Sequence, residues 1–145
     1  MSTVIEVMSN SDKLKIITDA LKSSKLLDIL DNEGPFTVFA PTDPAVAQAP
    51  ASKFRVIQGD PEQFKILAKY HVVKGFYDTK TIHELLKKKN HLELEAMCGK
   101  KLVLRASGFF KSHIRINDAS IVTGDLIADN GVIHTIDTVL FHQKE

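Results

Sequence analysis

The chain has 145 residues, 43% of them hydrophobic, which is enough for a single domain to bury a core of its own. Its 19 basic and 18 acidic residues nearly cancel, and this balance excludes the strongly basic composition typical of nucleic-acid-binding domains. Aromatic residues make up 7% and Trp is absent, which argues against a stacking platform for single-stranded nucleic acid. We therefore expect one domain over residues 1–145 with no nucleic-acid partner.

The cysteine content and the hydropathy pattern exclude further classes. Cys98 is the only cysteine, so the chain forms no internal disulfide and no cysteine-based zinc site. No stretch approaches the roughly 18 apolar residues that a transmembrane helix requires. Residues 1–10 lack a basic segment followed by an apolar run, so we expect no signal peptide in this chain. The protein is then either cytoplasmic or a mature form whose leader has been removed.

The first half of the chain has helical periodicity. Leu14, Ile17 and Leu21 follow the i, i+3, i+7 spacing of an amphipathic helix. Ser11 or Asp12 would serve as its N-cap, because their side-chain oxygens can accept from the free N–H groups of a first turn. The pattern predicts that this helix begins shortly after these two residues.

The segment from residue 26 to residue 61 contains signals for a short helix, a strand and two helix starts. Residues 26–30 predict a second short helix, and residues 36–40 predict a strand rich in β-forming side chains. Asp43-Pro44 and Asp60-Pro61 each predict a helix start in which Asp is the N-cap and Pro occupies the first helical position. Proline suits that position because its missing N–H would have no partner there in any case.

A further helix precedes a strand-rich second half. Thr81 and Glu84 have the spacing of a capping box and predict a helix that ends in Lys87-Lys88-Lys89. Beyond that point apolar and polar residues alternate with period two, as in half-buried strands, and Asn130-Gly131 predicts a tight hairpin turn with positive φ. Helices first and antiparallel strands later indicate an α+β fold with segregated layers. The apolar positions of the alternating segments are Leu92, Leu94, Ala96, Leu102, Leu104, Ile114 and Ile116.

Three segments resemble one known family. Thr-Val-Phe-Ala-Pro-Thr-Asp at 37–43 is similar to the first signature of fasciclin domains, and Tyr-His-Val-Val at 70–73 resembles their central Tyr-His segment. Asn-Gly-Val-Ile-His-Thr-Ile-Asp at 130–137 resembles the second signature. The resemblance implies a wedge of two β-sheets with helices packed beside it, mainly from the N-terminal half. It also implies a cell-adhesion or matrix-type role, an extracellular or cell-envelope location and no enzymatic activity.

The signature segments contain conspicuous polar residues. His71 shares the apolar side of its predicted helix with Leu67, which favours a buried imidazole bonded to the backbone. The alternative comes from the resemblance, because the Tyr-His segment, Tyr70 and His71 here, is implicated in integrin binding in some animal relatives. The signature residues to which we assign structural roles are Thr42, Asp43, Asn130, Gly131, His134 and Asp137.

The sequence offers no catalytic constellation. His83-Glu84 begins the helical zinc-protease motif, but Lys87 stands where that motif needs its second His. Glycine-rich phosphate loops and the Gly-x-Ser-x-Gly nucleophile motif do not occur. We expect no enzymatic activity, no catalytic residue, no cofactor and no metal site.

Charge is distributed unevenly along the chain. Residues 80–115 contain nine Lys or Arg and three Glu, a net charge of +6, which leaves −5 for the remainder. Such a split predicts a basic surface that attracts an anionic glycan or a membrane surface, although ordinary solvated strand and helix faces would produce the same count. The candidate partner-binding residues are Tyr70, His71, Lys87, Lys88, Lys89, Lys101, Arg105, Lys111 and Arg115.

Two functions are consistent with these observations. The first is a non-enzymatic adhesion or interaction module that recognises a protein, a glycan or a membrane surface. The second is a carrier of a small apolar ligand, or an intracellular accessory protein, that binds between the helices and the strands. A cavity of about 300 Å³ or more would favour the carrier. The sequence specifies neither the identity of the partner nor the oligomeric state.

Overall fold

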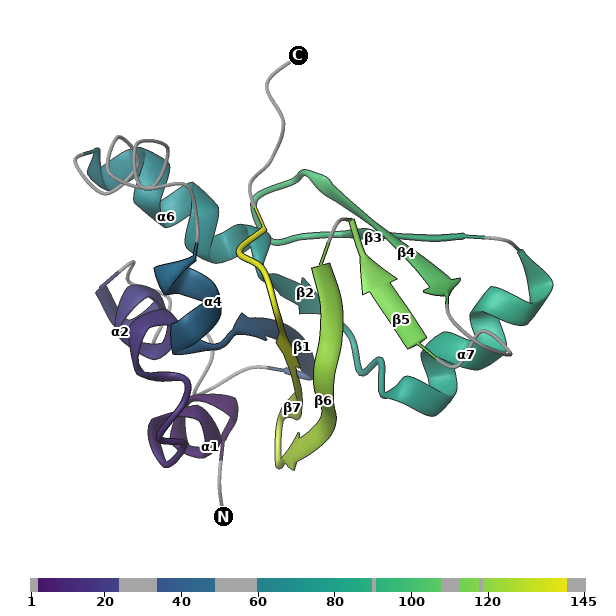
Figure 1. The fold of residues 1–145 in the computed structure, drawn as a ribbon, viewed down its shortest axis with the longest axis horizontal. Helices are drawn as coiled ribbons and strands as arrows, with labels where there is room; N and C mark the ends of the chain where they lie inside the picture. Colours follow the sequence, from purple (N-terminus) through teal and green to yellow (C-terminus); the bar gives the residue numbers. More distant parts are fainter. Residues whose placement is uncertain are drawn as a thin grey trace.

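The computed structural model describes residues 3–23, 34–48, 60–89, 91–107, 113–117 and 119–140. The predicted helix at 26–30 and the candidate residue Lys111 lie outside these ranges. Most helices gather on one side of the strands, while the last one lies at the opposite end of the molecule (Figure 1). The helices are α1 (Val4–Ser9), α2 (Lys15–Ser23), α4 (Asp43–Ala47), α6 (Pro61–Tyr70) and α7 (Thr79–Lys88).

The strands join in the order β2-β1-β7-β6-β5-β4-β3. Only the β1–β7 pair is parallel among the described strand pairs. The start of β6 pairs with β5 at Ala119 and Ser120, and the rest of β6 pairs with β7 from Ile121 onward. The β6–β7 pair contains register shifts between Ile121 and Leu126. The chain therefore folds as a wedge of two sheets with helices beside it. This arrangement confirms the predicted α+β class. The strands are β1 (Phe36–Pro41), β2 (Val72–Lys74), β3 (Leu92–Glu95), β4 (Lys101–Ser107), β5 (His113–Ile116), β6 (Ala119–Ala128) and β7 (Gly131–Ile136).

Two clusters of buried apolar residues form the core of the protein. One lies between the helices and β1, β2 and β7, and it includes Met8, Leu14 and Leu21. The other lies between the two sheets and against α7, whose buried Ile82 contributes to it. The alternating apolar residues predicted for the second half point into this second cluster, as period-two strands require. Its strand members are Phe39, Val73, Leu94, Leu102, Leu104, Ile114, Ile116, Ala119 and Ile136.

The start of α4 differs from the sequence prediction. Thr42 is the N-cap, and its hydroxyl accepts from the Ala45 N–H at 3.3 Å. The prediction that Asp43 caps this helix was wrong, because the helix begins one residue earlier than expected. The Asp43 carboxylate instead accepts from the N–H of Ile16 at 2.9 Å. Asp43 therefore caps the first turn of α2 from a distance, in place of the predicted Ser11 or Asp12.

Three other helix starts test the same kind of prediction. Asp60 caps α6 and accepts from two N–H groups of its first turn, as predicted. The capping box expected at Thr81 was wrong, because α7 begins at Thr79 and Asp78 is its N-cap. Helix α1 was not predicted, although Thr3 forms a capping box with the residue three positions later. Local capping signals thus locate helices but leave the cap uncertain by one to three residues.

A hairpin turn is present, but its two loop residues are Asp129 and Asn130, one position before the predicted Asn130-Gly131, because Ala128 pairs with Gly131. The prediction of a positive φ angle in this turn was wrong, because the described residues with positive φ all lie at other positions. Gly131 is required for a different reason: a Cβ there would lie 2.1 Å from the carbonyl oxygen of Phe36. The side-chain oxygen of Asn130 accepts from the Val4 N–H at 2.9 Å, so the signature turn holds α1 against the sheet.

Candidate interaction surface

Tyr70, the last residue of α6, lies inside the molecule with 4% of its surface exposed. Its hydroxyl donates to the carbonyl of Lys101 at 3.1 Å and accepts from the side-chain amide of Asn117 at 3.0 Å. Burial raises the pKa of the Tyr70 phenol above its ordinary value. The ring therefore links the end of α6 to β4 and to the turn after β5.

His71 is also buried, with 1% of its surface exposed. Its Nε2 accepts from the Leu140 N–H at 3.0 Å, so Nδ1 carries the proton and donates to the Leu67 carbonyl at 2.8 Å. Burial lowers the pKa of the imidazole to about 4. The predicted buried, backbone-bonded imidazole is confirmed, and both candidate residues of the Tyr-His segment are placed away from the surface.

His134 on β7 is a second buried imidazole. Its Nδ1 accepts from the Asp125 N–H at 3.1 Å, and its Nε2 lies 2.8 Å from the Tyr77 carbonyl, to which it donates. The ring stacks on Phe39 with centroids 5.8 Å apart, and burial lowers its pKa. Asp125, at φ 60°, accepts in turn from both the N–H and the hydroxyl of Thr79. His134 thus organises the irregular part of β6 that holds the start of α7.

Asp137, the last residue of the second signature, has a similar structural role. Its carboxylate accepts from the Ser120 N–H at 2.8 Å, and its own N–H donates to the Ser120 carbonyl at 3.1 Å. These bonds close the end of the β6–β7 pair. His134 and Asp137 thus hold neighbouring strands together through main-chain groups. Asp125 was missed because its partner Thr79 is 46 residues away.

The face of β3, β4 and β5 that points away from the core carries the exposed charges. We call this surface the outer face; its charged residues are Glu93, Glu95, Lys101, Arg105 and Arg115. Arg105 stands directly opposite Arg115 in the β4–β5 pair, and Arg115 is opposite Ser120 on β6. Like charges directly opposite each other are unfavourable, by a few tenths to about 1 kcal/mol. The fold thus places two arginine side chains opposite each other on adjacent strands.

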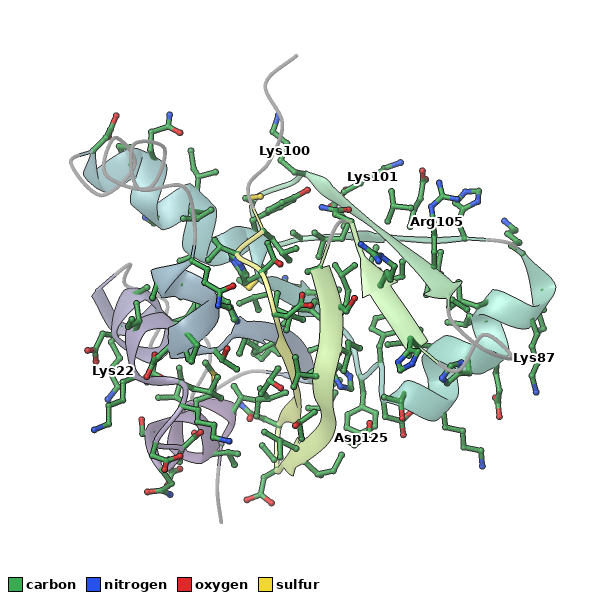
Figure 2. All side chains as sticks on the ribbon, viewed as in Figure 1. Lys22, Lys87, Lys100, Lys101, Arg105 and Asp125 are labelled. Carbon is green, nitrogen blue, oxygen red and sulfur yellow. The ribbon has the colours of Figure 1, made fainter. Side chains whose placement is uncertain are left out.

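Other cations lie on β4 and at the end of α7. Lys101 lies further along β4 and forms an exposed ion pair with Glu93 at 3.7 Å, a kind of contact that adds little stability. The exposed Lys87, Lys88 and Lys89 end α7. Figure 2 shows Lys87, Lys101 and Arg105 in the half of the molecule that holds α7 and β3–β5, and Lys22 in the opposite half. The basic surface stays a prediction, because ordinary solvated strand and helix faces would expose the same cations.

The described residues give no sign of a metal centre or a membrane-spanning helix. Within those ranges no group of three or more His, Cys, Asp or Glu is arranged to hold a metal ion. In the same part of the chain, no helix is both long and apolar enough to cross a bilayer.

Two hollows differ in size and character. The apolar one lies among α2, α4, α6 and Val139, beside His71, and has a volume of about 20 Å³. That volume suits about one water molecule rather than a small-molecule ligand. The other has a volume of about 490 Å³ and lies between β2 and β3, where polar and apolar residues both line it. The apolar hollow therefore does not provide the cavity that a carrier would need.

Comparisons with known proteins agree with the fold and its signatures. A family model described as the Fasciclin domain matches residues 12–142. The Synechocystis protein sll1735 is 30% identical over 97% of this chain and 98% of its own length. The transforming growth factor-beta-induced protein ig-h3 of Sus scrofa is 30% identical over 97% of this chain, which spans 19% of that protein. A domain pair from the insect cell adhesion molecule fasciclin I superposes with a TM-score of 0.76 at 18% identity, covering 97% of this chain and 51% of that one.

Proposed function

Because the chain belongs to the fasciclin-domain family, we propose that it is a non-enzymatic adhesion module whose outer face binds an anionic polysaccharide outside the cell or in the cell envelope. The insect protein whose domain pair shares this fold is described as a cell adhesion molecule, which fits the proposed adhesion role. The observation that carries the proposed surface is the Arg105–Arg115 pair, exposed and directly opposed on neighbouring strands.

Two opposed arginines suit an anionic group for a geometric reason. Directly paired residues on antiparallel strands have Cα atoms about 5 Å apart, so one sulfate or carboxylate group can contact both guanidinium groups. Ser120 lies next in the same row and can add a hydroxyl contact to a bound anion. Lys101 extends the positive charge along β4. A polymer with repeated anionic groups can contact several of these side chains at once.

The experiment measures retention of the protein on an immobilised sulfated polysaccharide at different salt concentrations. Retention should be clear at about 0.05 M salt and lost at about 0.5 M, because the Debye length falls from roughly 14 to 4 Å. The double variant Arg105→Glu/Arg115→Glu should lose retention at low salt. The matched control is Lys13→Glu/Lys22→Glu, which makes the same charge change at exposed positions beside and on α2 and should largely keep it.

Two results would contradict the proposal. One is retention that persists in the Arg105→Glu/Arg115→Glu variant, which would move recognition to another surface. The other is binding to vesicles of anionic phospholipid without binding to the polysaccharide, which would replace the glycan by a membrane surface. The small-ligand carrier is not proposed, because the apolar hollow beside the helices measures only about 20 Å³. The larger hollow of about 490 Å³ lies between β2 and β3, away from the predicted place between helices and strands, and charged residues line part of it.

A further inference from the structure

Helix α7 is weakly attached to the rest of the protein. Of its residues Thr79–Lys88, all of which the structure describes, only Ile82 is buried, whereas the shorter α1 buries three residues. Leu86, one turn further along α7, is half-buried against the cluster between the two sheets. A helix with few buried apolar contacts opens locally at a low cost in free energy. The bonds at the start of α7 therefore contribute much of its attachment.

Asp125 links the start of α7 to β6. Its carboxylate accepts from the Thr79 N–H at 2.9 Å and from the Thr79 hydroxyl at 2.5 Å. The N-cap Asp78 accepts from the Thr81 N–H within the helix itself, so this cap does not join α7 to the sheet. Gly124 packs so closely on α7 that a Cβ at residue 124 would lie 2.8 Å from Cγ2 of Thr79. The first turn of α7 is thus held on β6 by the carboxylate of one residue.

His134 fixes the main chain of Asp125. Its Nδ1 accepts from the Asp125 N–H at 3.1 Å, and its Nε2 donates to the carbonyl of Tyr77, which lies two residues before α7. This pair of bonds requires the neutral ring, because only an unprotonated Nδ1 can accept. A proton on Nδ1 would turn the contact with the Asp125 N–H into one between two donors. The imidazole therefore holds both sides of the junction between β6 and α7 only while it is neutral.

The groups around His134 decide how acid acts on this junction. Two carboxylates favour its protonated form, Asp125 on β6 and Asp78 at the start of α7, while on β1 the ring faces the uncharged Phe39. Burial has the larger influence and holds the pKa of His134 below its ordinary value of 6.5 in the folded protein. When the junction opens, water surrounds the ring and its pKa returns towards that ordinary value. The opened form then binds the proton more tightly than the closed form, so acid favours opening.

We propose that His134 is a pH-sensitive switch whose protonation releases the start of α7 from β6. The protonated ring loses the bond from the Asp125 N–H, and its new Nδ1–H competes with Thr79 for the Asp125 carboxylate. Both changes weaken the link between β6 and α7. Release uncovers the apolar side of α7 around Ile82, so an acidic medium exposes a surface that the neutral form keeps covered. The switch does not depend on the proposed polysaccharide surface.

The test is amide hydrogen exchange of the whole chain, measured by NMR from about pH 8 to about pH 5 and corrected for the intrinsic effect of pH on exchange. At the Thr79 and Asp125 amides, the opened fraction should rise by up to about tenfold for each pH unit below 6.5. At every pH it should also exceed the opened fraction of the Val38 and Ile133 amides in the centre of the sheet. That difference identifies a local opening rather than unfolding of the whole protein.

Variants assign the pH dependence to one imidazole. His134→Gln keeps a donor and an acceptor, and His134→Phe keeps an aromatic ring on Phe39, but neither side chain titrates. In each of these variants that folds, the dependence of the Thr79 opening on pH should disappear, whatever its basal level. His71→Gln is the matched control, because it replaces a buried imidazole that bonds Leu67 and Leu140 instead, and it should keep the dependence.

Thr79→Val tests the link to Asp125. It removes the hydroxyl bond and keeps the N–H bond, so the opened fraction should rise at every pH while its dependence on pH stays the same.

An opened fraction at Thr79 and Asp125 that stays constant from about pH 8 to about pH 5 would overturn the proposal. The same conclusion would follow if the pH dependence survived in His134→Gln or His134→Phe, or if Thr79 opened only together with Val38 and Ile133.

Discussion

The Tyr70–His71 segment and the Arg105–Arg115 pair were both candidates for partner binding, and the structure places them in opposite environments. The aromatic residues lie inside, with their polar atoms bonded to the protein itself. The arginines lie on an exposed sheet face, opposed to each other in register. The Tyr-His segment is thus explained by the packing and bonds it supplies, whereas the exposed arginines supply little packing of their own. The predictions below test this division between stabilising and recognising residues.

The largest effect is expected for Tyr70→Ala. The change removes a buried aromatic ring and leaves the Asn117 amide without one of its acceptors, so the free energy of unfolding should fall by about 3–5 kcal/mol. Urea denaturation measures this loss. The division between the two regions would be broken if stability were unchanged while partner binding disappeared.

The next largest effect is a pH dependence of stability from His71. Its folded pKa of about 4 lies below the ordinary value of 6.5, so between these values the unfolded chain binds more protons. Stability is therefore complete above about pH 6.5 and should fall by about 3 kcal/mol as the pH drops towards 4. Denaturation at a series of pH values measures the slope.

His71→Gln should flatten that slope, since the titrating group is gone. His113→Gln, at an exposed position on β5, should retain it. A wild-type slope that survives in His71→Gln would assign the pH dependence to other groups, of which the buried His134 is the next candidate.

A smaller effect is expected for Asp43→Ala, which removes the acceptor for the Ile16 N–H at the start of α2. Loss of such a cap should cost about 0.5–2 kcal/mol. Polysaccharide retention should not change when equal amounts of folded protein are compared. Asp12→Ala, an exposed acid near the same helix, serves as the control for charge alone. Lost retention with unchanged stability would make Asp43 part of a binding surface.

The smallest effect is expected for Arg105→Thr. Threonine favours strands, and the change removes one of two opposed like charges, so stability should stay within about 0.5 kcal/mol of wild type or rise slightly. Thermal denaturation at low salt is the measurement. A clear loss of stability would show that Arg105 has a structural role and would weaken the contrast with Tyr70.

The sequence predicted those features that depend on neighbouring residues. The alternation from Leu92 to Ile116 identified the buried side of the strands, because the period of a strand is local. The helical spacing from Leu67 also placed His71 on the apolar side of its helix. Neighbouring cap candidates could not be separated, since Thr42 and Asp43 are both good N-caps and only the position of α2 assigns them different roles.

Features set by distant contacts could not be predicted. Gly131 is needed because β1, far away in the sequence, passes directly beside it. The Arg105–Arg115 opposition depends on strand register, which a hydrophobic pattern alone does not fix. The basic segment was visible as a charge count, but the placement of Lys101, Arg105 and Arg115 on one sheet face was not.

The central claim is tested most directly by an NMR titration of the whole chain with a soluble sulfated oligosaccharide at low salt. Recognition on the outer face predicts salt-sensitive shift changes at the amides of Arg105, Arg115 and Ser120, with Tyr70 and His71 unaffected. Changes centred on Tyr70 and His71, with none on β4 and β5, would contradict the account and assign recognition to the Tyr-His segment.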